Sequence, residues 1–260
     1  DKGFFEDAGV DVKIEYFTAA KDRDAALTAG ELDGVLCDEV AISIYQNSDI
    51  DMQIISVTDG FWILVASKDS GIQSMADLEG KKVGLSENTM IEYLVDDMVT
   101  SSGLAVEDIE KVAIPSMPTR LEMLRNNQID AALLPAPFND VAIADGGLEI
   151  IKVDNTEANI AVLGMLKEAI TNKSAEVKAY VEAYNKAVEY INSTDISEYE
   201  DIIIKTVGYS EDMRGNITLP TYRKAELPPV EAVNKVMDWA KNKGLLTKDI
   251  SGTDVLHEVE

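Results

Sequence analysis

The chain has 260 residues, of which 46% are hydrophobic, and its 23 Lys plus Arg stand against 48 Asp plus Glu, which gives a formal net charge of −25. The hydrophobic fraction supports a sizeable core and excludes an intrinsically disordered chain. The strong negative charge repels nucleic acids and anionic membrane surfaces, so we expect no nucleic-acid partner.

The first half of the chain alternates strands with helices. Alternating or apolar runs predict strands at 12–17, 32–37, 52–57 and 62–67, with helices at 22–29 and 39–46. A fresh unit begins near Gly71, with strands at 82–85, 112–114 and 131–134. Each of these strands leads into a helix, ending near 102, 127 and 144.

The pattern then changes to a helical tail. Two more strands are expected at 149–153 and 160–165, followed by helices at 175–192, 198–207 and 230–242. The earlier strand–helix alternation favours an α/β fold with mostly parallel sheets and flanking helices. The amphipathic tail cannot bury its apolar face alone, so we expect it to pack back onto an earlier sheet.

Cysteine and histidine are nearly absent from the chain. One cysteine, Cys37, and one histidine, His257, exclude an intrachain disulfide and a cysteine–histidine zinc site. The base that would activate a nucleophilic Cys37 is missing nearby. The motifs GxGxxG, GxxxxGK[ST], HExxH and GxSxG are also missing. We therefore expect no enzymatic activity, no cofactor and no metal site.

The chain's ends and its apolar runs bear on localisation. No run approaches the ~18–20 apolar residues of a membrane span. The sequence opens at Asp1 without an initiator methionine or a signal peptide, so we expect a mature or trimmed product.

Candidate ligand-binding residues follow from the predicted sheets, because ligands of open α/β sheets bind beyond the carboxyl ends of the strands. The loops at those ends contain helix N-termini, hydroxyl groups and aromatic rings. The candidates are Asp38, Thr58, Asp59, Phe61, Trp62, Ser86, Glu87, Asn88, Thr89, Tyr93, Ser116, Met117, Thr119, Pro135, Ala136 and Phe138.

Several candidates also have a purely structural explanation. Ser86 fits the N-cap of the next helix, and Thr119 fits the N-cap of a helix beginning at Arg120. Asp38 could cap the following helix, and packing alone would explain Phe138. Other acidic residues, Glu31, Glu39 and the pair Asp96–Asp97, are interpreted as solvated faces.

Two adjacent aromatic residues can be separated by strand geometry. Successive side chains of a strand point to opposite faces of the sheet. One of Phe61 and Trp62 is therefore expected in the core, and the other is free to stack on a ligand.

Four segments of the sequence carry a family resemblance. They are KGFFEDAGVDV at 2–12, ALTAGELDG at 26–34, DLEGKKVG at 77–84 and VMDWAKNKGLL at 236–246. On these segments the chain resembles the type 2 periplasmic (solute-) binding proteins of the nitrate/sulfonate/thiamine-precursor group. The resemblance extends over essentially the whole chain.

The resemblance implies a fold and a role. The fold is the two-lobed periplasmic binding protein type 2 fold, with lobe I at 1–69 and 157–260, lobe II at 70–156, and a ligand cleft between them. The role is that of the extracytoplasmic, solute-binding component of an ABC import system, which captures a small molecule by hinge closure. The implied partner is the ABC transporter permease. The resemblance further implies a monomer that meets the membrane only through a lipid anchor not present in this chain.

The ligand class and two rival functions stay open. The rings of Phe61, Trp62, Tyr93 and Phe138 favour a flat molecule such as a thiamine-precursor pyrimidine. A sulfonate would find only Arg120 as a nearby cation. The rivals are an enzyme on the same fold, of the thiamine-pyrimidine or menaquinone pathway type, and the effector domain of a transcription regulator.

Overall fold

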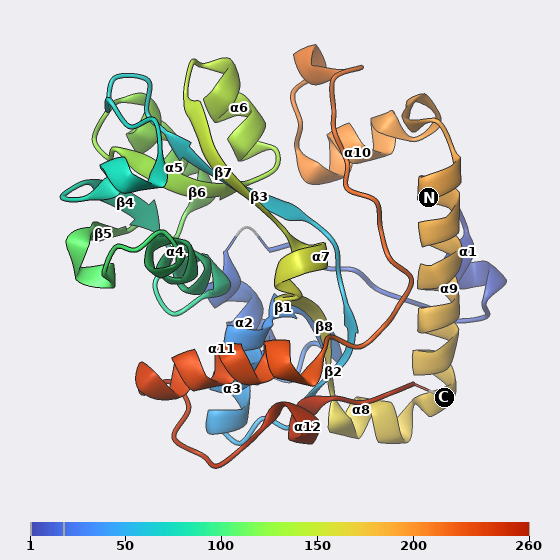
Figure 1. Cartoon of the computed structure of the whole chain (residues 1–260). Coiled ribbons are helices and arrows are strands. Elements are labelled where there is room, and N and C mark those ends of the chain that lie inside the picture. Colours follow the sequence, from blue (N-terminus) through green and yellow to red (C-terminus); the bar gives the residue numbers. More distant parts are fainter. Residues whose placement is uncertain (1, 18, 260) are drawn as a thin grey trace. The chain divides into compact units, whose positions relative to one another are not determined.

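The computed structural model describes residues 2–17 and 19–259, which divide into two compact units (Figure 1). Of the described residues, unit 1 comprises 2–17, 23–60 and 159–259, and unit 2 comprises 19–22 and 61–158. Each unit contains one sheet. None of the described helices combines the length and the apolar character that a bilayer span requires.

The sheet of unit 1 has three strands in the order β1 (Gly34–Asp38), β8 (Ala161–Leu166) and β2 (Met52–Val57). The central strand β8 is antiparallel to both neighbours, with Asp38 opposite Ala161 and Val57 opposite Val162. Strands β1 and β2 therefore finish at the same end of this sheet.

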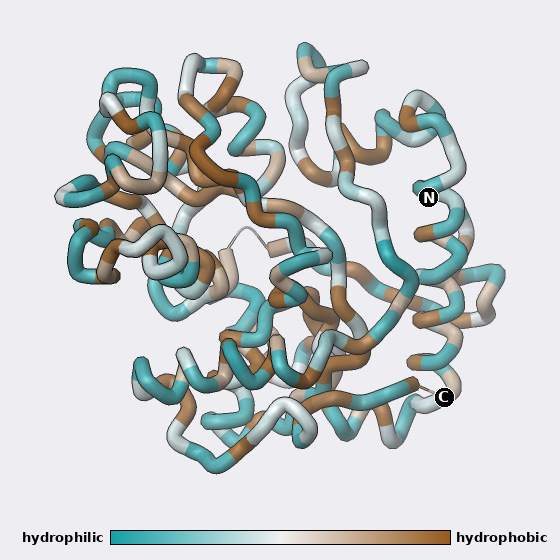
Figure 2. Tube along the Cα trace, in the orientation of Figure 1, coloured by the Kyte–Doolittle hydropathy of each residue, from teal (hydrophilic) through white to brown (hydrophobic). Residues whose placement is uncertain are grey.

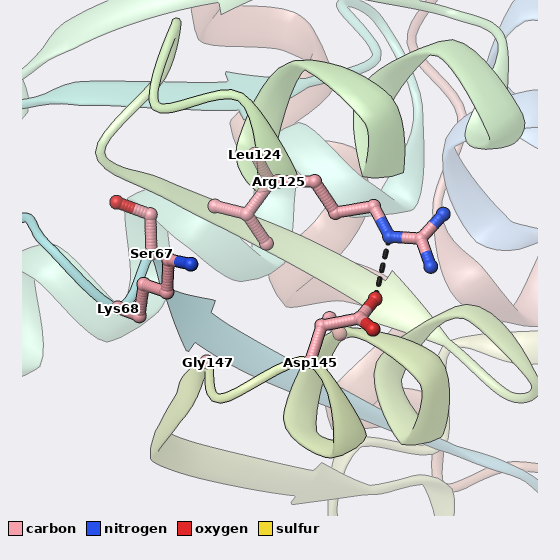
Figure 3. A pocket seen from close by; sticks show the side chains of 7 residues that line it. Ser67, Lys68, Leu124, Arg125, Asp145 and Gly147 are labelled. Carbon is pink, nitrogen blue, oxygen red and sulfur yellow. Dashed lines mark hydrogen bonds and ion pairs between the residues drawn. The ribbon is translucent and has the colours of Figure 1, made fainter.

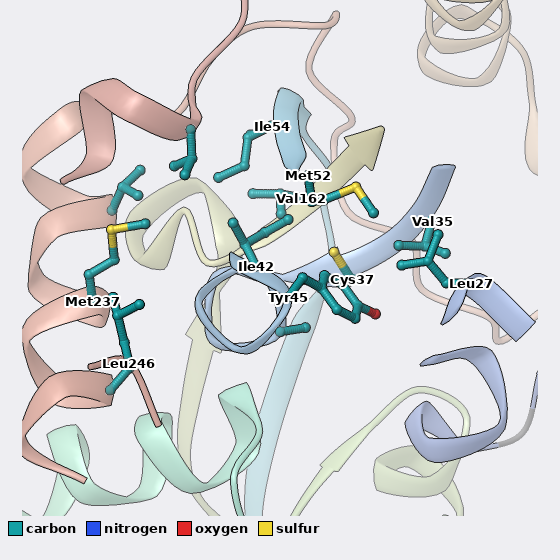
Figure 4. Packing of buried hydrophobic residues seen from close by; sticks show 14 residues of the cluster. Leu27, Val35, Cys37, Ile42, Tyr45, Met52, Ile54, Val162, Met237 and Leu246 are labelled. Carbon is teal, nitrogen blue, oxygen red and sulfur yellow. The ribbon is translucent and has the colours of Figure 1, made fainter. Parts of the chain in front are cut away.

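Helix α3 (Glu39–Asn47) lies close against this sheet. A Cβ atom added at Gly164 of β8 would stand 2.9 Å from Cδ1 of Ile42, so a larger residue there would force the Ile42 side chain to shift. The same core contains Met52 of β2 and Met237 of α11 (Val230–Asn242), as Figure 4 shows. The predicted return of the helical tail is confirmed, because α11 packs on α3.

The other long helix of unit 1 is α9 (Ser174–Ser193), which packs against α1 (Phe4–Asp7) and α8 (Lys167–Asn172). Hydrophobic and hydrophilic residues alternate along it, as expected for a helix with one buried face (Figure 2). The remaining α-helices outside residues 61–158 are α2 (Ala20–Thr28), α10 (Glu200–Val207) and α12 (Gly252–Val255).

The sheet of unit 2 has five strands in the order β5 (Glu110–Ala113), β4 (Lys82–Leu85), β6 (Ala131–Pro135), β3 (Phe61–Ala66) and β7 (Leu148–Asp154). Strand β4 is parallel to β5 and β6, whereas β3 is antiparallel to β6 and β7. The helices of this unit are α4 (Met90–Ser101), α5 (Met117–Arg125), α6 (Phe138–Ala144) and α7 (Asn155–Ala158).

The predicted α/β class is confirmed, but the expected strand direction is wrong for most of the described pairs. Among the described pairs of named strands, only β4 with its two neighbours is parallel. These strands follow one another in sequence through α4 and α5. Strand–helix–strand connections of this kind favour parallel pairing, so the prediction holds for these strands. Strands β3, β7 and β8 pair with strands distant in sequence, and local periodicity carries no information on their direction.

The strand predicted at 12–17 is also wrong. This segment is described without a strand partner, and Ile14 and Tyr16 are 56% and 72% exposed. Alternation of apolar and polar residues indicates a strand only when one face is buried.

Arg120 of α5 joins the carboxyl ends of three strands in unit 2. It is fully buried. Its Nε and Nη2 donate to the carbonyl oxygen of Ile114 at 3.1 and 2.7 Å, and its Nη1 donates to that of Leu133 at 3.0 Å. Nη2 also donates to Oγ of Ser86. Burial lowers the pKa of Arg120 to about 10, so the guanidinium remains charged at neutral pH.

We expect Arg120→Met to lower the free energy of unfolding by about 3 kcal/mol or more, because it leaves buried acceptors without a donor. The matched control is Arg125→Met in the same helix. Arg125 is partly exposed and pairs with Glu122 and Asp145 at the surface, so its loss should cost about 1 kcal/mol or less. Urea denaturation measures both values. Equal losses in the two variants would show that Arg120 does not hold the strand ends.

Candidate functional site

Polar loops gather at one end of the unit 2 sheet. The parallel strands β4, β6 and β5 present their carboxyl ends there, and antiparallel β3 begins at the same end, with Trp62 opposite Pro135. We call the loops 86–89, 114–119 and 135–138, together with residues 61–62, the unit 2 loop cluster. The structure thus places at this end the predicted site residues of unit 2 other than Tyr93, which lies one turn into α4, namely Phe61, Trp62, Ser86, Glu87, Asn88, Thr89, Ser116, Met117, Thr119, Pro135, Ala136 and Phe138. That they contact a ligand stays a prediction.

The loop after β4 is held by its own hydrogen bonds. Oγ1 of Thr89 accepts from the backbone N–H of Ile91 at 3.2 Å and donates to the carbonyl of Ser86 at 2.9 Å. Thr89 is therefore the N-cap of α4, and the alternative in which Ser86 caps that helix is wrong. The backbone N–H of Asn88, whose φ is 58°, donates to Oε2 of Glu92 at 2.7 Å. The side chains of Glu87 and Asn88 remain exposed.

The loop after β5 also begins its helix earlier than expected. Ser116, and not Thr119, is the N-cap of α5, and Oγ1 of Thr119 donates to Oγ of Ser116 at 3.0 Å. Pro118 lies in the first turn, where a missing N–H is tolerated. The prediction overlooked that proline favours helix starts as well as turns.

The aromatic candidates divide between core and sheet face. Phe61 belongs to the hydrophobic core of unit 2, and Nζ of Lys152 lies 4.0 Å from its ring centroid. Trp62 points to the opposite face of β3 and is 5% exposed. Phe138 packs against the same core as Phe61. Tyr93, one turn into α4, is buried. Of the four aromatic candidates, Trp62 and Tyr93 are therefore the two that lie outside that core.

In unit 1 the carboxyl end of β1 starts a helix. Asp38 caps α3, and its Oδ1 accepts from the backbone N–H of Ala41 at 2.9 Å. The side chain is almost fully buried, and this burial raises the pKa of Asp38. At the same end of the sheet, the N–H of Thr58 donates to the carbonyl of Ala161 at 2.9 Å.

Asp59 is a structural ion-pair partner. Its buried carboxylate accepts from Nε of Arg223 at 2.9 Å and from the backbone N–H of the same residue at 2.5 Å. Asp59 therefore anchors the segment around Arg223. Sequence reasoning missed Arg223, because 164 residues separate the two partners and no local pattern connects them.

Glu39, the first residue of α3, was expected to be solvated, and this prediction is wrong. Its side chain is fully buried, and in the part of the chain that the structure describes neither carboxyl oxygen has a hydrogen-bond partner. Burial, and to a lesser extent the neighbouring Asp38, raise the pKa of Glu39 to about 9. Its carboxyl is therefore neutral at pH 7. We call Asp38, Glu39 and Asp59 the unit 1 acidic end.

The pair Asp96–Asp97 was likewise expected to be solvated. Asp96 is instead 7% exposed. Nζ of Lys111 lies 2.5 Å from Oδ1 of Asp96 and 2.9 Å from Oε1 of Glu92, so Lys111 forms an ion pair with each carboxylate. These carboxylates are part of the packing of α4.

A surface pocket of unit 2 lies away from the candidate loops. Ser67, Lys68, Leu124, Arg125, Asp145 and Gly147 line it at the other end of β3 (Figure 3). Its guanidinium is already paired, with Nε of Arg125 2.5 Å from Oδ2 of Asp145. We therefore assign no ligand to it.

Metal ligands and an activated thiol were also sought. Among residues 2–17 and 19–259, no group of three His, Cys, Asp or Glu side chains could hold a metal ion. Cys37 is buried, and burial raises the pKa of its thiol, which keeps it protonated.

The raised pKa of Glu39 makes the stability of the protein depend on pH. A carboxyl with a pKa of about 9 when folded and 4.5 when unfolded contributes stability that is fully present below pH 4.5 and is lost as the pH rises through 9. We expect the thermal midpoint of the wild type to fall more steeply from about pH 6 to about pH 9 than that of Glu39→Gln. Glu231→Gln, at the exposed first turn of α11, is the control that should follow the wild type. Parallel curves for wild type and Glu39→Gln would contradict this assignment.

Two curated relatives match part of the chain. One from Brucella abortus, provisionally named a binding protein, is 31% identical over 133 residues, which cover 51% of this chain and 40% of the relative. One from Haemophilus influenzae, provisionally named a thiamine biosynthesis protein, is 30% identical over 145 residues, which cover 51% of this chain and 42% of the relative. The match thus spans about two fifths of the length of these relatives.

Solved structures share the fold over nearly the whole chain. The periplasmic aliphatic sulphonate binding protein SsuA from Escherichia coli superposes with a TM-score of 0.78 at 17% identity, covering 92% of this chain and 84% of that one. The desulfurization enzyme DSZB superposes with a TM-score of 0.67 at 14% identity, covering 99% and 91%. The fold therefore serves both binding proteins and an enzyme.

The sequence model of one family matches most of the chain. The family is described as "NMT1/THI5 like", and the match covers residues 1–194 of 260. The chain belongs to the NMT1/THI5-like family.

Proposed function

We propose that this protein is the extracytoplasmic solute-binding component of an ABC import system, which binds a small molecule and releases it unchanged to the permease. Membership of the NMT1/THI5-like family supports the proposal, as does the fold shared with a periplasmic binding protein. The two ligand classes that the similar proteins suggest are a thiamine-related compound and a sulfonate.

The observation that supports the proposal most is that two hydroxyl groups of the unit 2 loop cluster already form hydrogen bonds within the protein. Oγ of Ser86 accepts from Arg120, and Oγ1 of Thr89 is engaged with the backbone of its own loop. A nucleophilic hydroxyl would need a base beside it. The single histidine of the chain, His257, instead follows the bridge between Ile54 and Leu256 in unit 1. The cluster thus suits recognition better than group transfer.

We propose further that units 1 and 2 act as the two lobes of this fold. A ligand that contacts residues of both lobes binds the closed form best and so shifts the equilibrium towards closure. The lobe boundaries at 69/70 and 156/157 remain a prediction.

An enzyme is the second candidate, because a desulfurization enzyme shares this fold. The two candidates differ in one observable, which is whether the bound molecule is chemically changed on release.

A thermal-shift screen of thiamine-precursor aminopyrimidines, alkanesulfonates and amino acids tests the proposed function. At about 100 times its dissociation constant, a ligand that binds only the native protein adds about 2.7 kcal/mol of stability. We expect at least one compound to reach this gain and to be recovered with unchanged mass after denaturation. Recovery of a changed mass would favour the enzyme, and a screen with no stabiliser would contradict solute binding by this chain.

A further inference from the structure

Two connections between the units leave unit 1 from neighbouring strands. Besides the short segment 19–22, the chain passes from one unit to the other at 60/61 and at 158/159. In unit 1 the strands next to these connections are paired, with Val57 of β2 opposite Val162 of β8. The N–H of Thr58 donates to the carbonyl of Ala161 at 2.9 Å and extends this pairing by one step. The two connections therefore begin side by side in unit 1.

Arg223 contacts the unit 1 end of both connections. Its Nε donates to Oδ1 of Asp59 at 2.9 Å, and its backbone N–H donates to Oδ2 of Asp59 at 2.5 Å. Its Nη1 donates to Oδ1 of Asn159 at 2.9 Å. Only Gly60 follows Asp59 before the first crossing, and Asn159 is the first residue after the second. One guanidinium thus bridges the two connections at their last positions in unit 1.

The backbone around Arg223 is itself fixed to unit 1 on two sides. The side chain of Asn192 in α9 binds both backbone groups of Tyr222, at 2.7 and 3.1 Å. The N–H of Val57 in β2 donates to the carbonyl of Glu226 at 2.8 Å. The position of the guanidinium is therefore set by α9 and β2 together.

Both partners of Arg223 depend on the bridge. The side chain of Asp59 is fully buried, and a buried carboxylate that loses its cation is strongly destabilising. Asn159 has a φ of 53°, in the left-handed region that asparagine adopts more readily than most residues. The hydrogen bond from Arg223 thus holds an uncommon backbone conformation at the second crossing.

Beyond these residues each connection is short. Gly60 alone separates Asp59 from β3, and α7 separates Asn159 from β7. Within unit 2, β3 and β7 are paired from their first and last residues, with Phe61 opposite Asp154. A change of direction along the connections must therefore be absorbed at Gly60 and within 155–158, because the residues on either side are fixed by pairing or by Arg223.

We propose that Arg223 is a hinge clamp, a positioning residue that ties the two connections together in unit 1 and confines bending to Gly60 and residues 155–158. The inference rests on the proposal that units 1 and 2 act as two lobes. With both connections held by one side chain, their unit 1 ends move as a single body, and closure follows a defined path.

Hydrogen exchange of the unliganded full chain, followed by NMR, tests this inference at two backbone amides. The amide of Thr58 bonds the other connection through Ala161, and the amide of Val57 bonds the Arg223 segment through Glu226. Amides of α11, in the core of unit 1, serve as the reference for global unfolding of that unit.

Arg223→Met removes the bridge as a whole. Relative to the α11 amides, exchange at both Thr58 and Val57 should become at least about 10-fold faster, because charge-assisted hydrogen bonds are lost. The matched control is Arg214→Met in the same irregular segment. Its ion-pair partners, Asp201 and Glu211, belong to neither connection, so both exchange rates should stay as in the wild type.

Substitutions of Asn159 remove one arm of the bridge and leave Arg223 on Asp59. Asn159→Gly keeps the left-handed conformation accessible but removes the acceptor, whereas Asn159→Asp keeps both. We expect Asn159→Gly to speed exchange at Thr58 by at least about 10-fold and to leave Val57 unchanged, and Asn159→Asp to change neither. In the double variant Asn159→Gly/Arg223→Met, the two increases at Thr58 should fall short of their product, because both substitutions remove the same contact.

The outcomes distinguish this inference from the proposed function. Equal exchange at Thr58 in Asn159→Gly and Asn159→Asp, or increases that multiply in the double variant, would overturn the clamp and leave solute binding intact. An Arg223→Met variant in which Val57 alone exchanges faster would do the same, and if that variant does not fold, the comparison of the two Asn159 variants decides. A thermal-shift screen without a stabiliser would instead overturn the proposed function, and with it the role of the clamp in closure, whatever the exchange rates.

Discussion

The buried guanidinium of Arg120 is the interaction on which the candidate site of unit 2 depends. Parallel strands bring their carboxyl ends to one end of a sheet, but the carbonyl groups that leave the ladder there need donors. Arg120 supplies them to Ile114 and Leu133, and it binds the hydroxyl of Ser86 as well. One side chain thus fixes three loops. A Cβ atom added at Gly84 of β4 would lie 3.3 Å from Cγ of Arg120, so the glycine leaves room for the Arg120 side chain. Because its charge is committed to these neutral oxygens, Arg120 acts as a structural anchor and is poorly suited to binding an anionic ligand.

In unit 1, carboxyl groups bind the donors at the corresponding end of the sheet. Asp38 caps α3, and Asp59 binds Arg223. Both carboxyls satisfy backbone or guanidinium donors of unit 1 itself, as a capping residue and an ion-pair partner normally do. Glu39 differs from them, because neither of its carboxyl oxygens has a hydrogen-bond partner within the described chain.

The sequence predicted the elements well where the pattern is local. Strand β4 was expected at 82–85 and is Lys82–Leu85, and the helix expected at 230–242 is α11, Val230–Asn242. The family and the α/β fold also follow from the sequence. The segment 12–17 failed because alternation does not reveal whether a partner strand is present. The helix starts near Ser86 and Thr119 were misplaced, because each loop has two hydroxyl residues three positions apart, and either could cap the helix.

Tertiary partners could not be predicted. Nothing local relates Asp59 to Arg223, and a glutamate in the first turn of a helix is normally solvated. The burial of Glu39 and the internal use of Arg120 both depend on packing by distant segments.

Native mass spectrometry of the protein purified without added ligand tests the central claim most directly, because it weighs the molecule that the protein captures in the cell. The account predicts a bound small molecule that keeps its mass after release and rebinding. A mass that changes on incubation with the protein would contradict it.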